Sequence, residues 1–177
     1  MATNPNPFAS KSGDTQSSRS MNVQLRIDDK DLKDFLRVMN SMGKEANTEL
    51  KKEVLKISEM TATTLRFSAS SKRQKIIANT IKARYDRLPT ISIGGSKKIT
   101  GYSRNGGTVG DMLYGVEFGA RKGYLRNGGR SFPTRSNPTP SGGNNGWWIF
   151  PTLRKVQPEI RRRWYQAVDE LIEQWSN

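Results

Sequence analysis

GDMLYGVEFGA (residues 110–120) and GWWIFPTLRKVQPEIRRRW (residues 146–164) are the two segments with the clearest pattern in this 177-residue chain. Residues 112–118 form a short apolar run that stops at a glycine, and this run predicts a strand. Residues 120–146 carry no apolar pattern. A compact domain that inserts so long a loop between two pieces of its core usually uses the loop to contact something outside itself.

The second segment opens an amphipathic helix that runs almost to the C-terminus. Because proline is best tolerated in the first helical turn, we expect this helix to begin near Thr152 or at Pro158. Arg161, Arg162 and Arg163 lie early in it and its acidic residues lie late, which opposes the helix dipole and hints that these charges serve a contact. Apolar residues at helical spacing predict its buried face: Val156, Ile160, Trp164, Ala167, Leu171 and Trp175.

The remainder of the chain alternates short strands with helices. The pattern predicts a strand over residues 21–27, a helix over 28–42 ended by Gly43, a second helix over 45–68, a third over 71–88, and β pieces over 90–93 and 99–102. The turn residues that follow these β pieces, Gly94-Gly95 and Asn105-Gly106-Gly107, predict an antiparallel hairpin or meander. We interpret the apolar stripes of these helices as core faces rather than partner grooves. In the second helix the stripe is Leu50, Val54, Ile57, Thr61 and Leu65.

Composition limits the classes of function. The net charge is +14 and hydrophobic residues make up 33 % of the chain, which suits a modest core and a polyanionic or acidic partner. The chain has no cysteine and no histidine, so disulfides, thiolate chemistry and the commonest general base and metal ligand are excluded. No apolar run approaches the roughly 18 residues that cross a membrane. The first 20 residues have no apolar core of a secretory signal.

Motifs of enzyme sites are also missing from the sequence. The glycines of GDMLYG and GGRSFP lack the Lys-Ser/Thr ending of a phosphate-binding loop. Asp111 and Glu117 lie six residues apart on the expected strand, roughly 20 Å by strand rise, which is too far for paired acid–base work. We therefore expect no catalytic residue, no cofactor and no metal site. An enzyme remains the weakest alternative.

Basic residues are the strongest chemical feature. Between Arg66 and Arg104 there are ten Lys or Arg residues and one acid, and between Arg121 and Arg135 there are five and none. Such blocks indicate sequence-independent contact with phosphates, or a basic surface that meets acidic neighbours, or an ordinary solvated surface. At this net charge we favour a contact surface. The adjacent tryptophans Trp147 and Trp148 could form a platform on which bases stack. We favour the alternative in which one ring lies in the core and the other at an interface.

The order of these segments resembles the small head–tail joining proteins of tailed bacteriophages, a family that includes neck, tail-completion and tail-terminator-like proteins. The resemblance covers roughly residues 21–175. It depends on the leading strand and helices, the sequence YGVEFG (residues 114–119), then Ile149-Phe150-Pro151 and a terminal helix. It implies a ring-forming structural protein without catalytic residues. The loop over residues 120–146 is longer and more basic than this family suggests, and residues 1–20 form an additional arm.

We therefore expect a single α+β domain over residues 21–177. In it, a small antiparallel sheet packs against two or three long helices, one of which is the C-terminal helix. A flexible arm over residues 1–20 precedes the domain, and a basic loop over residues 120–146 is inserted into it. The implied function is a virion protein of the neck, assembled in the host cytoplasm, whose hexameric ring joins the portal of the DNA-filled head to the tail tube around the DNA channel. Its expected partners are further copies of itself, other neck and tail proteins, and double-stranded DNA, with no membrane. The alternative is a nonspecific DNA-binding protein. Candidate contacts with DNA or an acidic partner are Lys97, Lys98, Arg104, Arg121, Lys122, Arg126 and Arg130. Candidate subunit contacts are Phe8, Tyr114, Glu117, Phe118, Tyr124, Phe132 and Trp147.

Overall fold

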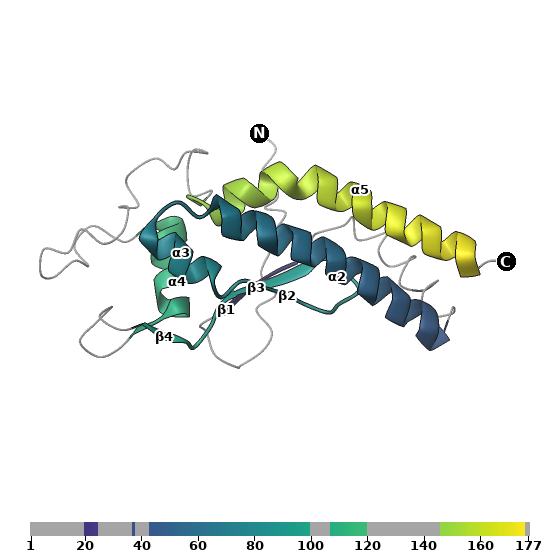
Figure 1. Cartoon of the computed structure of the whole chain (residues 1–177), viewed down its shortest axis with the longest axis horizontal. Coiled ribbons are helices and arrows are strands. Elements are labelled where there is room, and N and C mark those ends of the chain that lie inside the picture. The colour runs from purple at the N-terminus through teal and green to yellow at the C-terminus, as the bar shows by residue number, and fades with distance from the viewer. Residues whose placement is uncertain (1–19, 25–36, 38–42, 100–106, 120–145, 176–177) are drawn as a thin grey trace, which may run out of the picture.

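A computed structural model describes residues 20–24, 37, 43–99, 107–119 and 146–175 of the chain (Figure 1). Helices and small antiparallel sheets are mixed along it, and a long helix ends it, so the predicted α+β class is confirmed. The elements in chain order are β1 (Ser20–Gln24), α2 (Gly43–Ser68), α3 (Lys72–Ala78), β2 (Lys82–Ala83), β3 (Thr90–Gly94), β4 (Lys98–Ile99), β5 (Gly107–Thr108), α4 (Val109–Phe118) and α5 (Ile149–Trp175). Of the helix expected over residues 28–42, only Arg37 is described, and it is helical.

Three of the strands form a sheet in the order β1–β3–β2, with antiparallel pairing throughout. Val23 lies opposite Ile91, and both side chains are buried, because directly opposed residues of paired strands face the same side of the sheet. The strands β4 and β5 form a separate antiparallel pair. The antiparallel pairing expected of a hairpin or meander is confirmed, but β3 pairs with β1 and β2 and not with β4. Gly94 and Gly95, both at positive φ, turn the chain out of the first sheet before β4 begins.

The long helices α2 and α5 pack side by side (Figure 1). The helix predicted over residues 45–68 is confirmed as α2, and its predicted stripe is buried. The helix α5 begins at Ile149, earlier than expected, and carries Pro158 in its interior. Its predicted start is therefore wrong, because a cap supplied by another element, described below, starts the helix before the first proline. On its stripe Ile160, Trp164, Ala167 and Leu171 are buried and Val156 is partly buried.

The third helix is much shorter than predicted. It begins with a capping box between Ser71 and Gln74 and ends at Ala78 instead of continuing to residue 88. The hydroxyl of Thr80 donates to the carbonyl of Ile77 and accepts the N–H of Gly94, which ties the chain to β3. The next residues then pair with β3 as the strand β2. Sheet pairing thus overrides the helical spacing of the apolar residues after position 78.

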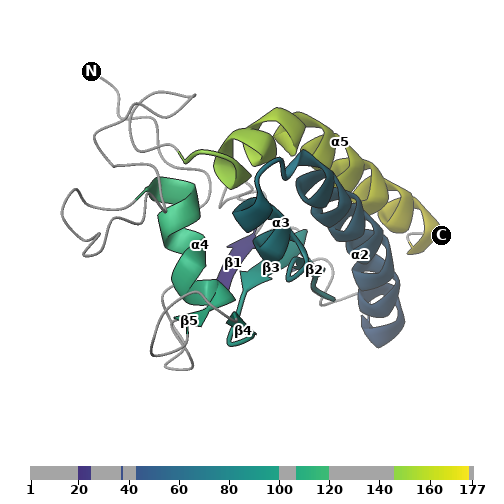
Figure 2. The same cartoon turned by 60° about the vertical axis from the view of Figure 1, so that its left-hand side comes forward.

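The strand predicted over residues 112–118 is wrong, because this segment is the helix α4 (Figure 2). Thr108 and Asp111 form a capping box that satisfies the first free N–H groups of the helix. Met112, Leu113 and Val116 are buried at spacings that suit one face of a helix. A short apolar run does not distinguish a buried strand from a buried helix.

The buried side chains form two clusters. One lies between the first sheet, α3, α4 and the adjoining ends of α2 and α5, and includes Ile93, Leu113 and Ile149. The other lies between the first half of α2 and the second half of α5, where Trp164 is almost fully buried. The indole N–H of Trp164 donates to the carbonyl of Arg87, so the segment after β2 is fastened to α5. The first cluster positions the ends of the inserted loop.

Candidate functional site

The last turn of α4 and the first turn of α5 meet at the base of the inserted loop. Glu117, near the end of α4, is completely buried. Its carboxylate accepts the backbone N–H groups of Trp148, at 3.2 Å, and of Ile149 and Phe150, both at 2.9 Å. The backbone carbonyl of Glu117 also accepts the N–H of Trp147 at 2.8 Å. The side chain of one helix therefore caps the N-terminus of the other and joins the two ends of the loop.

Two glycines make this close approach possible. Gly119 ends α4 at a φ of 76° and donates its N–H to the carbonyl of Gly115. Gly146 has a φ of 82°, and a Cβ atom there would overlap Oε1 of Glu117 and lie 3.2 Å from the Cβ atom of Phe150. Only glycine adopts this backbone conformation readily while leaving space for the carboxylate. The glycines that flank the loop in the sequence are thus structural parts of its base.

The electrostatics of Glu117 combine two opposing effects. Burial raises the pKa of its carboxyl from 4.5 to about 7, because a charge loses its hydration inside the protein. The three N–H groups at the N-terminus of α5 and the charge of Arg154 act in the opposite direction and favour the carboxylate. Glu117 therefore titrates near neutral pH while it holds the two helices together.

Aromatic side chains close the same region. The rings of Phe118 and Phe150 lie 5.5 Å apart, and those of Tyr114 and Phe118 lie 6.4 Å apart. Trp148 is buried, and its indole N–H donates to the hydroxyl of Ser68 at the end of α2. Trp147 is half-buried. The prediction that one of the paired tryptophans closes the core is confirmed for Trp148.

The predicted subunit contacts that the structure describes lie in different environments. Tyr114 is 49 % exposed, and Phe118 and Trp147 are half-buried. Glu117 lies in the interior, so its assignment to a surface contact is corrected: its carboxylate is used by the N–H groups of α5. The others, Phe8, Tyr124 and Phe132, lie outside the described residues.

Lys97 and Lys98 are exposed and stand at the opposite end of α4 from the loop base. The carbonyl of Lys97 accepts the N–H of Val109, in the first turn of the helix. Ten helical residues separate the two ends by about 15 Å, and Figure 2 shows β4 and β5 at the foot of α4. The remaining predicted cationic contacts, Arg104, Arg121, Lys122, Arg126 and Arg130, lie outside the described residues. The predicted arm and loop do as well, apart from Ser20 and Gly146.

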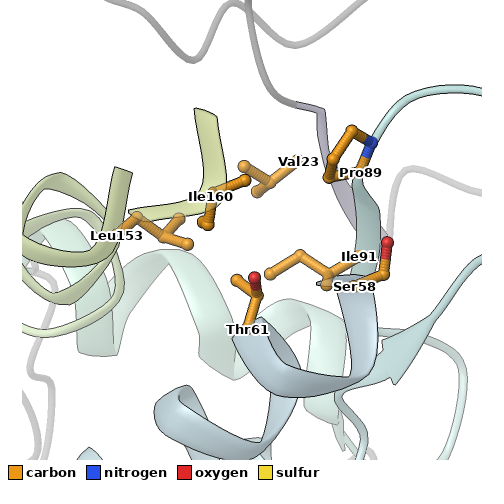
Figure 3. Close-up of a pocket in the computed structure, with 7 residues that line it drawn as sticks. All are labelled: Val23, Ser58, Thr61, Pro89, Ile91, Leu153 and Ile160. Atoms are coloured by element: carbon orange, nitrogen blue, oxygen red, sulfur yellow. The ribbon is translucent and has the colours of Figure 1, made fainter. Parts of the chain in front are cut away.

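A small cavity lies between the sheet and the two long helices, lined by mostly apolar side chains (Figure 3). Its volume of about 20 Å³ holds about one water molecule. The hydroxyl of Ser58 at its wall accepts the N–H of Thr90. This space is too small for a substrate. The lining residues are Val23, Ser58, Thr61, Pro89, Ile91, Leu153 and Ile160.

Within the described ranges, no three His, Cys, Asp or Glu side chains gather as a metal site would require. Asp111 is engaged in the capping box of α4, and Glu117 caps α5. The estimate of 20 Å between these two residues is wrong, since six helical residues span about 9 Å. What this arrangement does chemically is to satisfy buried N–H groups and fix the ends of a long loop.

Sequence reasoning missed the role of Glu117. The signal was present as one acid inside an apolar run, together with a glycine directly before the apolar start of the last helix. Among the described helices, none is both long enough and apolar enough to span a membrane. No protein-family model, curated protein or solved structure matches the chain.

Proposed function

We propose that the protein is a structural subunit of a tailed-bacteriophage neck. Six copies form a ring that joins the portal of the DNA-filled head to the tail tube, and the ring surrounds or lines the DNA channel. The protein acts by docking and by shape, without a cofactor and without catalysis. It is assembled in the host cytoplasm and becomes part of the virion.

The observation that carries this proposal is the contact between YGVEFG (residues 114–119) and WWIFP (residues 147–151). The resemblance to neck proteins rests largely on these two segments, which are separated by 27 residues in the sequence. In the structure Glu117 joins them by hydrogen bonds, and Phe118 packs on Phe150. The two motifs thus act as one unit, which supports a common structural purpose.

The loop base also suits a protein that presents a long segment to neighbours. Closing a loop costs conformational entropy that grows only slowly with loop length, so a base that holds both ends makes a long insertion tolerable. Here the base consists of buried hydrogen bonds and aromatic packing, with Trp148 fastened to α2 through Ser68. Residues that bind partners commonly lie on loops whose ends are held by a rigid scaffold.

Measurement of size in solution tests the ring. We expect the purified chain, alone or with neck partners, to form a hexamer by light scattering in high salt, where contacts with nucleic acid are screened. The exposed Tyr114 is a predicted subunit contact, so Tyr114→Arg should shift the population toward monomer. Tyr165, which is 41 % exposed on α5 and was not predicted at an interface, provides the matched control as Tyr165→Arg. Equal effects of the two variants, or a monomer under every condition, contradict the proposal.

The second candidate is a nonspecific DNA-binding protein that acts as a monomer or dimer. The exposure of Lys97 and Lys98 favours it. Such a protein should lose affinity for DNA steeply between about 50 and 200 mM salt, and it should not form rings when DNA is absent. Light scattering with and without DNA distinguishes this candidate from a neck protein.

A further inference from the structure

The helix α5 carries a second stripe of apolar side chains, on its solvent side. Pro158, Tyr165 and Ile172 recur every seven residues, a spacing that keeps them on one side of a helix. Pro158 is exposed, Tyr165 is 41 % exposed, and Ile172 is partly exposed. Trp164, in contrast, lies in the buried cluster between α2 and α5, and Figure 1 shows α5 at the margin of the molecule. We call Pro158, Tyr165 and Ile172 the outer seam.

The charge of α5 changes sign along the helix. Residues 154–163 contain five Lys or Arg residues and one acid, whereas residues 164–175 contain three acids and no Lys or Arg. Lys155, Arg162 and Asp169 also recur every seven residues, and all three are exposed. Each of them lies three or four residues from a member of the outer seam, which makes it a neighbour of the seam on the helix surface. One edge of the seam is therefore positive in its first half and negative in its second half.

This pattern is complementary to itself when the helix is reversed. Pro158 and Ile172 lie seven residues before and seven after Tyr165. Arg162 and Asp169 lie three residues before and four after it. A second α5 placed antiparallel on the first, with the two tyrosines at the centre, brings each Arg162 opposite an Asp169 and each proline opposite an isoleucine. The apolar contacts extend about 10 Å to either side of the centre, because a helix rises 1.5 Å per residue. A two-fold axis makes every contact twice.

Two of these side chains are already held in position. The ring of Tyr165 packs edge-on against Trp164, with 5.2 Å between the ring centres. The Nε and Nη2 atoms of Arg162 donate to the carboxylate of Glu159 at 2.9 Å and 2.8 Å. Glu159 also accepts Arg163, but one acid does not cancel the five cations of this half of the helix. Side chains that are ordered before binding lose less conformational entropy on binding.

The change of sign favours a second copy over other occupants of this face. A partner of a single charge, such as a nucleic acid or a uniformly acidic protein, is repelled by one half of the seam. A fitting partner carries both signs in the reverse order, and α5 of another copy does so. The seam has only three apolar side chains, which is less than a stable dimer interface provides, so the contact depends on its charges.

We propose that two copies of the chain dock through the outer seam, with their α5 helices antiparallel and the two Tyr165 side chains at a two-fold axis. This contact goes beyond the proposed ring, because the predicted ring contact Tyr114 lies on α4 and neighbours around a six-fold axis do not meet through a two-fold axis. The seam therefore joins one ring to another. It does not depend on ring formation, since single chains would pair through it as dimers.

The test is light scattering of the full chain at about 150 mM and about 1 M salt. The Debye length is about 8 Å in the first, which screens the net charges of two copies but not opposed side chains, and about 3 Å in the second, which weakens both. We expect the mass at about 150 mM to be twice the mass in about 1 M salt. Arg162→Glu should weaken pairing by more than about tenfold, because it faces Asp169 twice. The control, Arg163→Glu, has the same net charge on nearly the opposite side of α5 and should lose less than about threefold.

A mixture of two variants tests the antiparallel arrangement. Arg162→Glu and Asp169→Arg should each fail to pair alone. In the mixture, the new glutamate of one chain opposes the new arginine of the other, and the unchanged Asp169 and Arg162 oppose each other, so the doubled mass should return. Tyr165→Arg should abolish the doubling at about 150 mM and leave the mass in about 1 M salt unchanged. Thermal melts check that each variant is folded.

Several outcomes overturn the inference. Equal masses at the two salt concentrations show that the seam does not pair, and equal losses in Arg162→Glu and Arg163→Glu show that net charge determines association. A mixture that stays unpaired refutes the antiparallel arrangement. An unpaired wild type that binds a duplex through Arg162 shows that nucleic acid covers this face. The ring is measured in about 1 M salt, so a hexamer that does not double refutes only the seam, and a monomer that doubles refutes only the ring.

Discussion

Removing the carboxylate of Glu117 should release the N-terminus of α5 from α4. In Glu117→Ala, three backbone N–H groups lose their acceptor in a site that water does not reach. Each unsatisfied buried donor costs about 1 to 3 kcal/mol, and relief of the burial cost of the carboxyl offsets part of the sum. We expect a loss of about 3 kcal/mol in the free energy of unfolding. Glu117→Gln keeps one acceptor oxygen and should lose about half as much.

Urea unfolding followed by circular dichroism measures this loss. The matched control is Glu159→Gln, because Glu159 also binds several donors, those of Arg162 and Arg163, but on the solvent side of α5. Exposed ion pairs contribute little, so the control should unfold close to wild type. If Glu117→Ala unfolds at the same urea concentration as this control, the carboxylate does not hold the loop base together.

Three other predictions concern the same helices. In urea unfolding, Gly146→Ala should destabilise the chain by more than about 2 kcal/mol, because the added Cβ atom overlaps Glu117. The control is Gly43→Ala, at a φ of 88° with open space around it, which should lose only the backbone strain of about 1 kcal/mol. Equal losses in the two variants contradict the overlap. Because the pKa of Glu117 is raised, the folded chain binds this proton more tightly than the unfolded chain. The free energy of unfolding gained from this proton is complete below pH 4.5. It is lost as the pH rises to about 7, and the loss is about 3 kcal/mol. Unfolding series between pH 4.5 and 7.5 should show this fall in wild type and not in Glu117→Gln, and parallel curves refute the assignment. Pro158→Ala should raise the melting temperature, because a proline inside α5 lacks an N–H donor and crowds the preceding turn; a lower melting temperature would show that α5 requires a local distortion there.

The long helices and the fold class were predictable because their apolar residues recur at helical spacing over many turns. Leu50, Val54 and Ile57 on α2 are buried, as the spacing predicts. In such long segments, one or two polar residues at buried positions do not obscure the helical spacing of the apolar residues. The C-terminal helix was predicted for the same reason, although its start was misplaced.

Short segments were not predictable in this way. Residues 112–118 have enough apolar side chains for a strand or a helix, and the capping pair Thr108 and Asp111 favours the helix. The apolar residues after Ala78 are consistent with a helix, but pairing with β3 determines the backbone. In both cases a contact outside the segment selects the structure.

The loop base depends on residues that are 29 positions apart, Glu117 and Gly146. Periodicity within either segment contains no information about this contact. A single buried acidic residue is unusual, and it indicates that hydrogen-bond donors lie nearby, because a buried carboxyl requires them. The free N–H groups of a helix start are such donors, and α5 supplies them.

Electron microscopy of particles assembled without this chain is the decisive test of the proposed role in joining heads to tails. We expect DNA-filled heads and finished tails that remain separate, and joining should be restored when the purified chain is added. Complete virions assembled in its absence would show that the chain is not a neck protein.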